Sequence, residues 1–197
     1  MVDKNKPIGI LGYQGCIEPH EAMYARLGIP TLRVKTAEEL ASVDRLILPG
    51  GESTTMLRFI KLYNMFEPLR EFVKQHPTWG ICAGSILLAQ EVINPAQASL
   101  GAIDITAHRN FYGSQIDSFV TPIAISLLDK PIEAHFIRAP LLNDSKHHTG
   151  SAPLETLATL QGQPVFFAQG NVWACSFHVE LGSDPRLHAL FAARTMS

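Results

Sequence analysis

One cysteine stands in a pattern that would make it a nucleophile. Residues 78–84 read TWGICAG, an extended run followed by a glycine on either side of Cys82, two positions away. In a strand–turn–helix, this spacing is the cysteine version of the nucleophile elbow, whose sharp turn lifts the side chain out of the sheet. The following helix N-terminus favours the thiolate, and the Ala83 N–H points to where an oxyanion would form. Taken alone, the pattern also fits a tight turn around a buried cysteine.

A second pattern, near the C-terminus, supplies the groups that a thiol nucleophile needs. Such a nucleophile requires a base, and the base requires a group that orients it. His178 and Glu180 are two residues apart, so in an extended segment their side chains share one face. Glu180 would then bind one imidazole nitrogen and leave the other for Cys82. Taken alone, this pair also fits a solvated strand end.

A glycine-rich segment is the third element. The sequence LPGGES, residues 48–53, lies between a predicted strand and a predicted helix, where the loops of a parallel sheet converge on a ligand crevice. Consecutive glycines let backbone N–H groups approach a ligand, so Gly50–Gly51 can supply a second oxyanion donor. A plain strand-to-helix turn with Ser53 as its N-cap is the simpler interpretation, and both can hold together.

The elements that must position these residues alternate between strand and helix in the first half of the chain. The predicted strands are residues 8–11, 31–34, 45–48 and 78–82. The predicted helices are residues 18–27, 37–41, 54–62, 66–75 and 85–92. This alternation predicts parallel pairing in a doubly wound α/β sheet.

The second half is richer in strands. Strand-like runs cover residues 118–125, 132–137, 156–160, 163–167 and 172–177. The Gln161-Gly162 pair between two of them predicts a hairpin turn. A C-terminal helix is expected with Ser183 as N-cap and Pro185 in its first turn, continuing to Arg194. A polar surface loop is expected at 143–153, and with no linker visible, residues 1–197 are expected to form a single domain.

Composition excludes several classes of protein. Sixteen Lys and Arg against eighteen Asp and Glu give a formal charge of −2, without the basic surplus of a nucleic-acid binder. An apolar fraction of 46% is typical of a folded globular protein. Apolar runs fall far short of the roughly 18 residues that would cross a bilayer, so no membrane association is expected.

The cysteines indicate the compartment in which the protein is expected, and the histidines bear on whether it binds a metal. Cys16, Cys82 and Cys175 form no CxxC pair, and the N-terminal residues lack a signal-peptide pattern, so reduced thiols in the cytoplasm are expected. Cys16 and Cys175 are expected to be structural. The adjacent His147 and His148 lack metal-ligand spacing, and neither a metal nor a cofactor is expected.

Together, the three elements resemble the class I (triad) glutamine amidotransferases, and within them the glutaminase subunits of pyridoxal phosphate synthase. The class at large shares the elbow and the His-x-Glu pair. LPGGESTT at residues 48–55 and FIRAP at residues 136–140 carry the narrower resemblance. Further similar motifs are GILGYQG at residues 9–15, Arg109-Asn110 with Gly113, and DSF at residues 117–119. The resemblance covers nearly the whole chain.

This resemblance implies a flavodoxin-like, doubly wound, mostly parallel sheet with helices on both faces. It implies that Cys82 is the nucleophile, His178 the base and Glu180 the group that orients it. The implied oxyanion hole is formed by Gly51 and Ala83. The implied contacts to glutamine are Gly51, Glu52, Ser53, Arg109, Ile137 and Arg138. Because a guanidinium can hold a carboxylate with two hydrogen bonds, the two arginines suit the α-carboxylate of glutamine.

The activity implied is hydrolysis of L-glutamine to L-glutamate and ammonia through a cysteine thioester. The ammonia would pass to a separate synthase subunit, in a hetero-oligomer that makes pyridoxal phosphate. Two alternatives remain. A cysteine peptidase or deglycase-like hydrolase of the same architecture would not need LPGGESTT or the Arg-Ala-Pro segment. A catalytically silent regulatory subunit would have no chemical need for an intact Cys82, His178 and Glu180.

Two residues depart from the pattern of the family. Val179 stands between His178 and Glu180 where proline is usual, and valine permits the extended path without enforcing it. Ser85 follows the second elbow glycine, where an apolar residue is more usual. We expect Ser85 to affect packing near the site rather than the reacting atoms.

Overall fold

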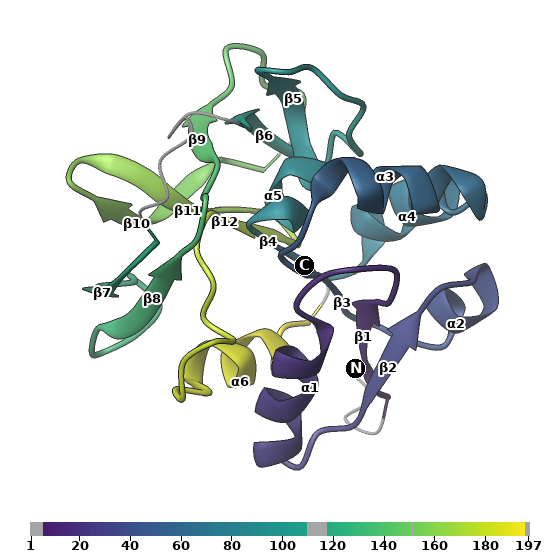
Figure 1. Cartoon of the computed structure of the whole chain (residues 1–197), viewed down its shortest axis with the longest axis horizontal. Coiled ribbons are helices and arrows are strands. Elements are labelled where there is room, and N and C mark those ends of the chain that lie inside the picture. Colours follow the sequence, from purple (N-terminus) through teal and green to yellow (C-terminus); the bar gives the residue numbers. More distant parts are fainter. Residues whose placement is uncertain (1–5, 110–117, 151, 196–197) are drawn as a thin grey trace.

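The centre of the protein is a seven-stranded sheet, seen in a computed structural model that describes residues 6–109, 118–150 and 152–195. Its strands lie in the order β10-β11-β12-β4-β3-β1-β2 (Figure 1). Their bounds are β1 (Ile8–Leu11), β2 (Thr31–Val34), β3 (Leu46–Leu48), β4 (Thr78–Ile81), β10 (Glu155–Leu160), β11 (Gln163–Gln169) and β12 (Val172–Cys175). The five strands β2-β1-β3-β4-β12 pair in parallel, in the strand order of flavodoxin-like sheets. The doubly wound, mostly parallel fold is therefore confirmed.

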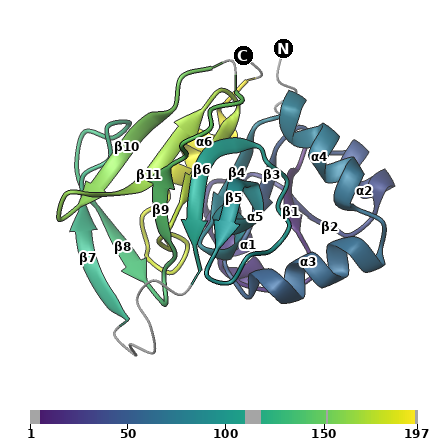
Figure 2. The same ribbon diagram turned by 90° about the horizontal axis from the view of Figure 1, so that it is seen from above.

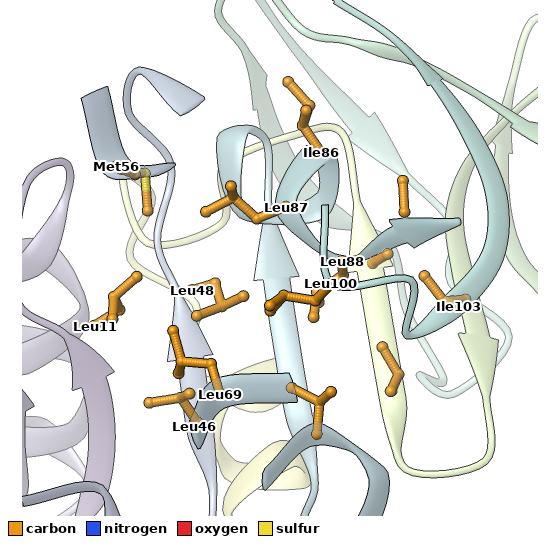
Figure 3. Close-up of a cluster of buried hydrophobic side chains, with 14 of the residues drawn as sticks. Leu11, Leu46, Leu48, Met56, Leu69, Ile86, Leu87, Leu88, Leu100 and Ile103 are labelled. Atoms are coloured by element: carbon orange, nitrogen blue, oxygen red, sulfur yellow. The ribbon is translucent and has the colours of Figure 1, made fainter. Parts of the chain in front are cut away.

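Helices cover both faces of this sheet. They are α1 (Ile17–Arg26), α2 (Ala37–Ala41), α3 (Ser53–Leu62), α4 (Phe66–Gln75), α5 (Ala83–Leu88) and α6 (Arg186–Ala192). Residues along β3 alternate between two hydrophobic clusters: Leu46 and Leu48 join the cluster with α3, α4 and α5, whereas Ile47 joins the one with α1 and α6. Figure 3 shows part of the first cluster. The two clusters fix the sheet between its helical layers.

Two smaller sheets extend the molecule beyond the parallel strands. The first contains β5 (Ala89–Ile93), β6 (Ile103–His108) and β9 (Leu141–Asp144), and the second pairs β7 (Phe119–Ile123) with β8 (Ile132–Phe136). Figure 2 shows β7, β8 and β10 on one side of the molecule and α2, α3 and α4 on the other. In the described ranges, no helix is long and apolar enough to cross a membrane.

The helix predicted over residues 85–92 is wrong in its second half. It ends at Leu88, and the chain continues directly as β5, which pairs with β6 in parallel. No strand was predicted at β6, and the loop predicted from residue 143 begins inside β9. The strands β5, β6 and β9 form because each has a neighbouring strand to pair with. Such pairing is a tertiary effect, and the local sequence pattern does not predict it.

The C-terminal helix is shorter than predicted. It begins at Arg186 and ends at Ala192, and the Asp184 carboxylate, not Ser183, accepts the hydrogen bond of the Arg186 N–H at 3.0 Å. The predicted hairpin turn is confirmed: Gln161 and Gly162 have φ values of 51° and 81°, the pair of positive values that a tight two-residue hairpin requires. The other predicted elements agree within two residues at each end.

Candidate active site

Cys82 occupies a strained turn between β4 and α5. Its φ and ψ are 49° and −104°, a backbone conformation that costs energy in any residue but glycine. The turn is held from both sides, because the Cys82 N–H donates to the Cys175 carbonyl at 2.8 Å and the Ser85 hydroxyl donates to the Cys82 carbonyl at 2.6 Å. The unusual Ser85 therefore bonds the elbow itself.

The glycines around Cys82 allow three elements to pack backbone against backbone. A Cβ added at Gly84 would overlap the Leu48 carbonyl of β3, and one at Gly80 would lie 2.6 Å from the Gly84 carbonyl oxygen. No side chain fits at either position. The G-x-C-x-G spacing is thus required by the approach of α5 to β3 and β4, and it fixes the elbow in the middle of the sheet edge.

His178 comes to this edge because β12 lies beside β4. The two strands pair with Cys175 opposite Ile81, so the segment after β12 passes next to Cys82. Its backbone is held by two hydrogen bonds to His135, with His178 N donating at 2.8 Å and His178 O accepting at 3.0 Å. On the other side, a Cβ at Gly50 would overlap the His178 ring. The imidazole is therefore fixed between the glycine loop and β8.

The His178–Glu180 pair has the geometry that the spacing predicts. Nδ1 of His178 lies 2.6 Å from Oε1 of Glu180, and both side chains are buried. Val179, which replaces the more usual proline, is buried in the hydrophobic cluster on that side. Packing of the valine side chain thus holds the backbone between His178 and Glu180 extended, the conformation that a proline would impose through its ring.

Burial and hydrogen bonding oppose each other at this pair. Burial alone would lower the pKa of His178, but hydrogen bonds with Cys16, Cys82 and Glu180 outweigh it and raise that pKa. Burial alone would raise the pKa of Glu180, but the imidazoles of His20 and His178 outweigh it and lower that pKa to about 2. At neutral pH the pair is a carboxylate bonded to an imidazolium.

A pocket of about 350 Å³ opens in front of Cys82 and His178. Its lining contains every site residue that the resemblance implied except Glu180, which lies behind the imidazole. These residues are Gly51, Glu52, Ser53, Cys82, Ala83, Arg109, Ile137, Arg138 and His178. Four further lining residues were not predicted: Gln14, Cys16, Ile86 and Ala139. Gln14 and Cys16 follow β1, at the same carboxyl edge of the sheet, so the rule that identified the glycine loop also applies to them.

The glycine loop ends in a helix cap that differs from the expected one. Glu52, not Ser53, caps α3, and its carboxylate accepts hydrogen bonds from the N–H groups of Thr54 at 3.2 Å and Thr55 at 2.8 Å. A carboxylate at a helix N-terminus is stabilised by the helix dipole as well. Burial would raise the pKa of Glu52, yet these hydrogen bonds lower it. Ser53 instead donates to Gln97 at 3.2 Å.

Two guanidinium groups reach the pocket from different elements. Arg109, just after β6, donates to the Thr54 hydroxyl at 2.6 Å and to Glu52 at 3.3 Å. Arg138 follows β8, is exposed, and has a positive φ of 45°. Residues 110, 113 and 117, which belong to motifs that carry the family resemblance, lie outside the described residues. The pocket thus has cationic side chains to receive an anionic group.

Three residues lie near the site although the sequence did not place them there: Cys16, which was expected to be structural, and the histidines His20 and His188. Cys16 brings its sulfur within 4.8 Å of a His178 nitrogen and a Glu180 oxygen, and these ligand types suit a metal ion although no metal was expected. His20 and His188 lie behind Glu180. Cys16 is the N-cap of α1, His20 lies four residues later in the same helix, and His188 lies in α6. No local spacing links either helix to the elbow or to the His178–Glu180 pair.

A strained cysteine between a parallel strand and a helix, with a buried His–Glu pair beside it in a flavodoxin-like sheet, is the arrangement expected of a class I glutamine amidotransferase. The comparisons agree. A solved glutamine amidotransferase structure superposes with a TM-score of 0.85 at 37% identity and covers 93% of this chain and 96% of its own. Another, from Thermotoga maritima, has a TM-score of 0.60 at 16% identity and shares the fold.

The chain belongs to the SNO glutamine amidotransferase family, whose model matches residues 10–197. It is 45% identical to the pyridoxal 5'-phosphate synthase subunit PdxT of Thermosipho africanus, over 93% of this chain and 96% of that protein. It is 43% identical to the protein of that name from Haemophilus ducreyi, over 95% of each chain. The family resemblance inferred from LPGGESTT and FIRAP is confirmed.

Proposed function

We propose that this chain is the glutaminase subunit of a pyridoxal 5'-phosphate synthase, and that it hydrolyses L-glutamine through a thioester at Cys82. The observation that carries the proposal is the pocket in which Cys82, His178 and two arginines meet. Glu180 holds the far side of the imidazole at 2.6 Å. The names of the relatives support the role of a synthase subunit.

In the first half of the reaction, Cys82 attacks the carboxamide carbon of glutamine as a thiolate, because its thiol proton is held by His178. Negative charge develops on the carboxamide oxygen, and the N–H groups of Ala83 and Gly51 hold it. Ala83 suits this role because it is the first residue of α5, and such N–H groups have no acceptor within the helix. His178, protonated at neutral pH, donates its proton to the leaving nitrogen. The C–N bond breaks, ammonia leaves and a glutamyl thioester remains.

In the second half, water replaces ammonia. His178, now neutral, takes a proton from the water as its oxygen attacks the thioester carbon. The C–S bond breaks, its electron pair stays on the Cys82 sulfur as a thiolate, His178 keeps the proton taken from water, and glutamate leaves. Throughout both steps Glu180 keeps the same imidazole nitrogen bonded, so the other nitrogen stays directed at the reacting atoms.

Recognition of glutamine requires a cation for its carboxylate, an acceptor for its ammonium and backbone donors. Arg138 and Arg109 are proposed for the carboxylate, since a guanidinium can hold it with two hydrogen bonds. Glu52 is the proposed acceptor, with Gly51, Ser53 and Ile137 completing the contacts. Arg109 is already bonded to Glu52 and Thr54, so it meets the substrate in a fixed orientation and loses little freedom on binding.

The proposed acceptor of the ammonia is a separate synthase subunit in a hetero-oligomer, as the word subunit in the relatives' names suggests. The chain itself is proposed to act as one glutamine amidotransferase domain, residues 1–197. We place it in the cytoplasm because all three of its cysteines are free thiols, which reducing compartments preserve.

Ammonia and glutamate release from L-glutamine tests the proposal, measured on the chain alone and then during titration with the synthase subunit. We expect hydrolysis, and we expect the synthase to increase it, because a double-glycine loop must settle into one conformation before it can hold an oxyanion. Absence of glutamate in both conditions would contradict the glutaminase function. Faster turnover of a peptide or a glycated amine would favour the peptidase or deglycase alternative. A maximal rate without the synthase would refute the loop activation alone.

A further inference from the structure

Behind the His178–Glu180 pair lies a second, fully buried pair of histidines. His20 from α1 and His188 from α6 approach each other with 2.9 Å between His20 Nδ1 and His188 Nε2. Both residues have no exposed surface. The other nitrogen of His20, Nε2, faces Oε2 of Glu180 at 3.8 Å. A continuous row of side chains therefore runs from Cys82 through His178, Glu180 and His20 to a second helix.

The two atoms that face each other between Glu180 and His20 can satisfy each other, because one is a hydrogen-bond acceptor and the other can be a donor. Among the described residues, neither Glu180 Oε2 nor His20 Nε2 has a hydrogen-bond partner, although both are buried. A buried carboxylate oxygen without a hydrogen-bond partner destabilises the folded protein, and an N–H group directed at it removes that destabilisation. The 3.8 Å separation is longer than a hydrogen bond. Contacts of this kind are often long in a ligand-free enzyme and shorten when the substrate complex forms.

The hydrogen bond between the histidines decides which nitrogen of His20 carries the proton. If His188 Nε2 donates to His20 Nδ1, the proton of neutral His20 is on Nε2 and faces the carboxylate. If His20 Nδ1 instead donates to His188 Nε2, the lone pair of His20 Nε2 faces Glu180. Two electron-rich atoms, this nitrogen and Glu180 Oε2, would then repel each other in the protein interior. Burial lowers the pKa of His20 and lowers that of His188 to about 3, so both rings are neutral at pH 7. The first arrangement is favoured by electrostatics.

We propose that His20 is a positioning residue of the glutaminase, which donates its Nε2–H to Glu180 Oε2 and is held in that tautomer by His188. The inference rests on the proposed function. Glu180 would then be held at both oxygens, by His178 on one side and by His20 on the other. A carboxylate fixed in this way cannot rotate away from His178, so the imidazole keeps its direction toward Cys82 while its charge changes.

Aromatic side chains enclose the two histidines and keep water out. The Trp79 ring centroid lies 6.4 Å from that of His20 and 5.3 Å from that of His188, and the Tyr24 ring lies 5.2 Å from His188. In the part of the chain that the structure describes, the titratable groups that face Glu180 are His20, His178, Cys16 and Cys175; those that face His20 are Glu180, His178 and His188. His20 is the neutral donor in this set that approaches Oε2.

Substitution of His20 by leucine and by glutamine separates a positioning role from a packing role. Leucine fills a similar volume without a donor, whereas glutamine can place an N–H near the position of Nε2. We expect H20L to lower kcat for glutamine by about tenfold to a hundredfold, the usual effect of losing such an orienting partner. KM should change little, since His20 does not reach the pocket. H20Q should recover most of the lost kcat.

The pH profile gives a second readout that a packing defect would not move. Without the donor, the charged form of buried Glu180 loses support and its pKa rises, so the acid limb of kcat/KM should shift to higher pH in H20L and return in H20Q. His76→Leu is the matched control. His76 precedes β4 at its amino end, stacked on Phe72 with 4.3 Å between ring centroids, whereas Cys82 follows the carboxyl end.

A measurement on the unmodified protein covers the case in which the variants do not fold. Nitrogen-15 NMR of the histidine rings reports the tautomer, and we expect neutral His20 with its proton on Nε2. A proton on Nδ1 would overturn the proposal, as would folded H20L and H20Q with equal kcat and equal pH profiles. If the unmodified chain, with the synthase subunit present, releases no glutamate, then the proposed function fails, while the tautomer still tests the His20–Glu180 contact.

Discussion

The two sides of the His178 ring are built in opposite ways. On the pocket side, loops from several strands bring polar groups and glycines to an open volume of about 350 Å³. On the far side, Glu180, His20 and His188 are buried side chains on packed segments, enclosed by aromatic rings. The pocket side must admit a substrate and change charge during a reaction. The buried side has only to hold one carboxylate still, and close packing does this best.

This difference explains how the site can be both strained and stable. The left-handed backbone at Cys82 costs energy locally, but the hydrogen bonds from Ser85 and to Cys175 hold it, and the two hydrophobic clusters on the sheet anchor the strands beneath. Substitutions on the pocket side should therefore act mainly on rate or binding. Substitutions on the buried side should act on rate through orientation, and on stability as well.

The largest effect is expected on the pocket side, at the nucleophile. Cys82→Ala should abolish glutamine hydrolysis, with a loss of roughly 10⁴-fold or more, because it removes the sulfur that the elbow presents to the pocket. Ammonia release and circular dichroism measure activity and folding together. Cys175→Ala is the control, a fully buried thiol whose loss should affect stability more than rate. Glutamine hydrolysis by the Cys82 variant would move the nucleophile elsewhere and contradict the mechanism.

Glu180 stands at the boundary between the two sides, and Glu180→Gln should have the next largest effect. Glutamine keeps the volume but loses the charge and can favour the wrong imidazole tautomer, which in a related triad costs about 10⁴-fold. We expect kcat to fall by roughly 10³-fold with a small change in KM. Steady-state kinetics on the folded variant provide the measurement. A large rise in KM instead would mean that Glu180 contacts the substrate.

Selective labelling compares the three thiols directly. A diazo-ketone analogue of glutamine should modify Cys82 alone, because that sulfur lies at the elbow in the pocket. Cys175 is fully buried, and burial raises its pKa far above that of a free thiol. Cys16 is the real competitor, since it lines the same pocket and approaches the same imidazole. Peptide mass mapping that finds Cys16 labelled as fast as Cys82 would contradict the assignment of the nucleophile.

The pocket side and Glu180 could be predicted from the sequence, whereas His20 and His188 on the buried side could not, for a physical reason. The elbow, the glycine loop and the His-x-Glu pair are local patterns, because each is required by one turn or one strand edge. The contact between His20 and His188 joins residues 168 positions apart, and each alone resembles any histidine on a helix. The same reason accounts for β5, β6 and β9, which depend on strand partners distant in the sequence.

The buried side should also determine how stability depends on pH. The folded protein keeps His188 neutral down to about pH 3, whereas the unfolded chain protonates it near 6.5. Between these values the unfolded state binds more protons, so the free energy of unfolding should fall as the pH is lowered through this window. Denaturant unfolding at several pH values measures the slope. His188→Leu should reduce that slope by about one proton, and an unchanged slope would mean that His188 is protonated in the folded state.

The smallest predicted effect lies at Ser85, on the pocket side. Its hydroxyl bonds the Cys82 carbonyl at 2.6 Å, but that carbonyl also accepts from the N–H groups of Ser85 and Ile86 at 3.1 and 3.3 Å. Ser85→Ala therefore leaves no unsatisfied acceptor, and we expect a loss of about 1 kcal/mol in the free energy of unfolding. If the hydroxyl also holds the strained turn, kcat should fall severalfold while KM stays constant. Loss of stability with an unchanged kcat would show that the glycines and the Cys175 hydrogen bond suffice to fix the elbow.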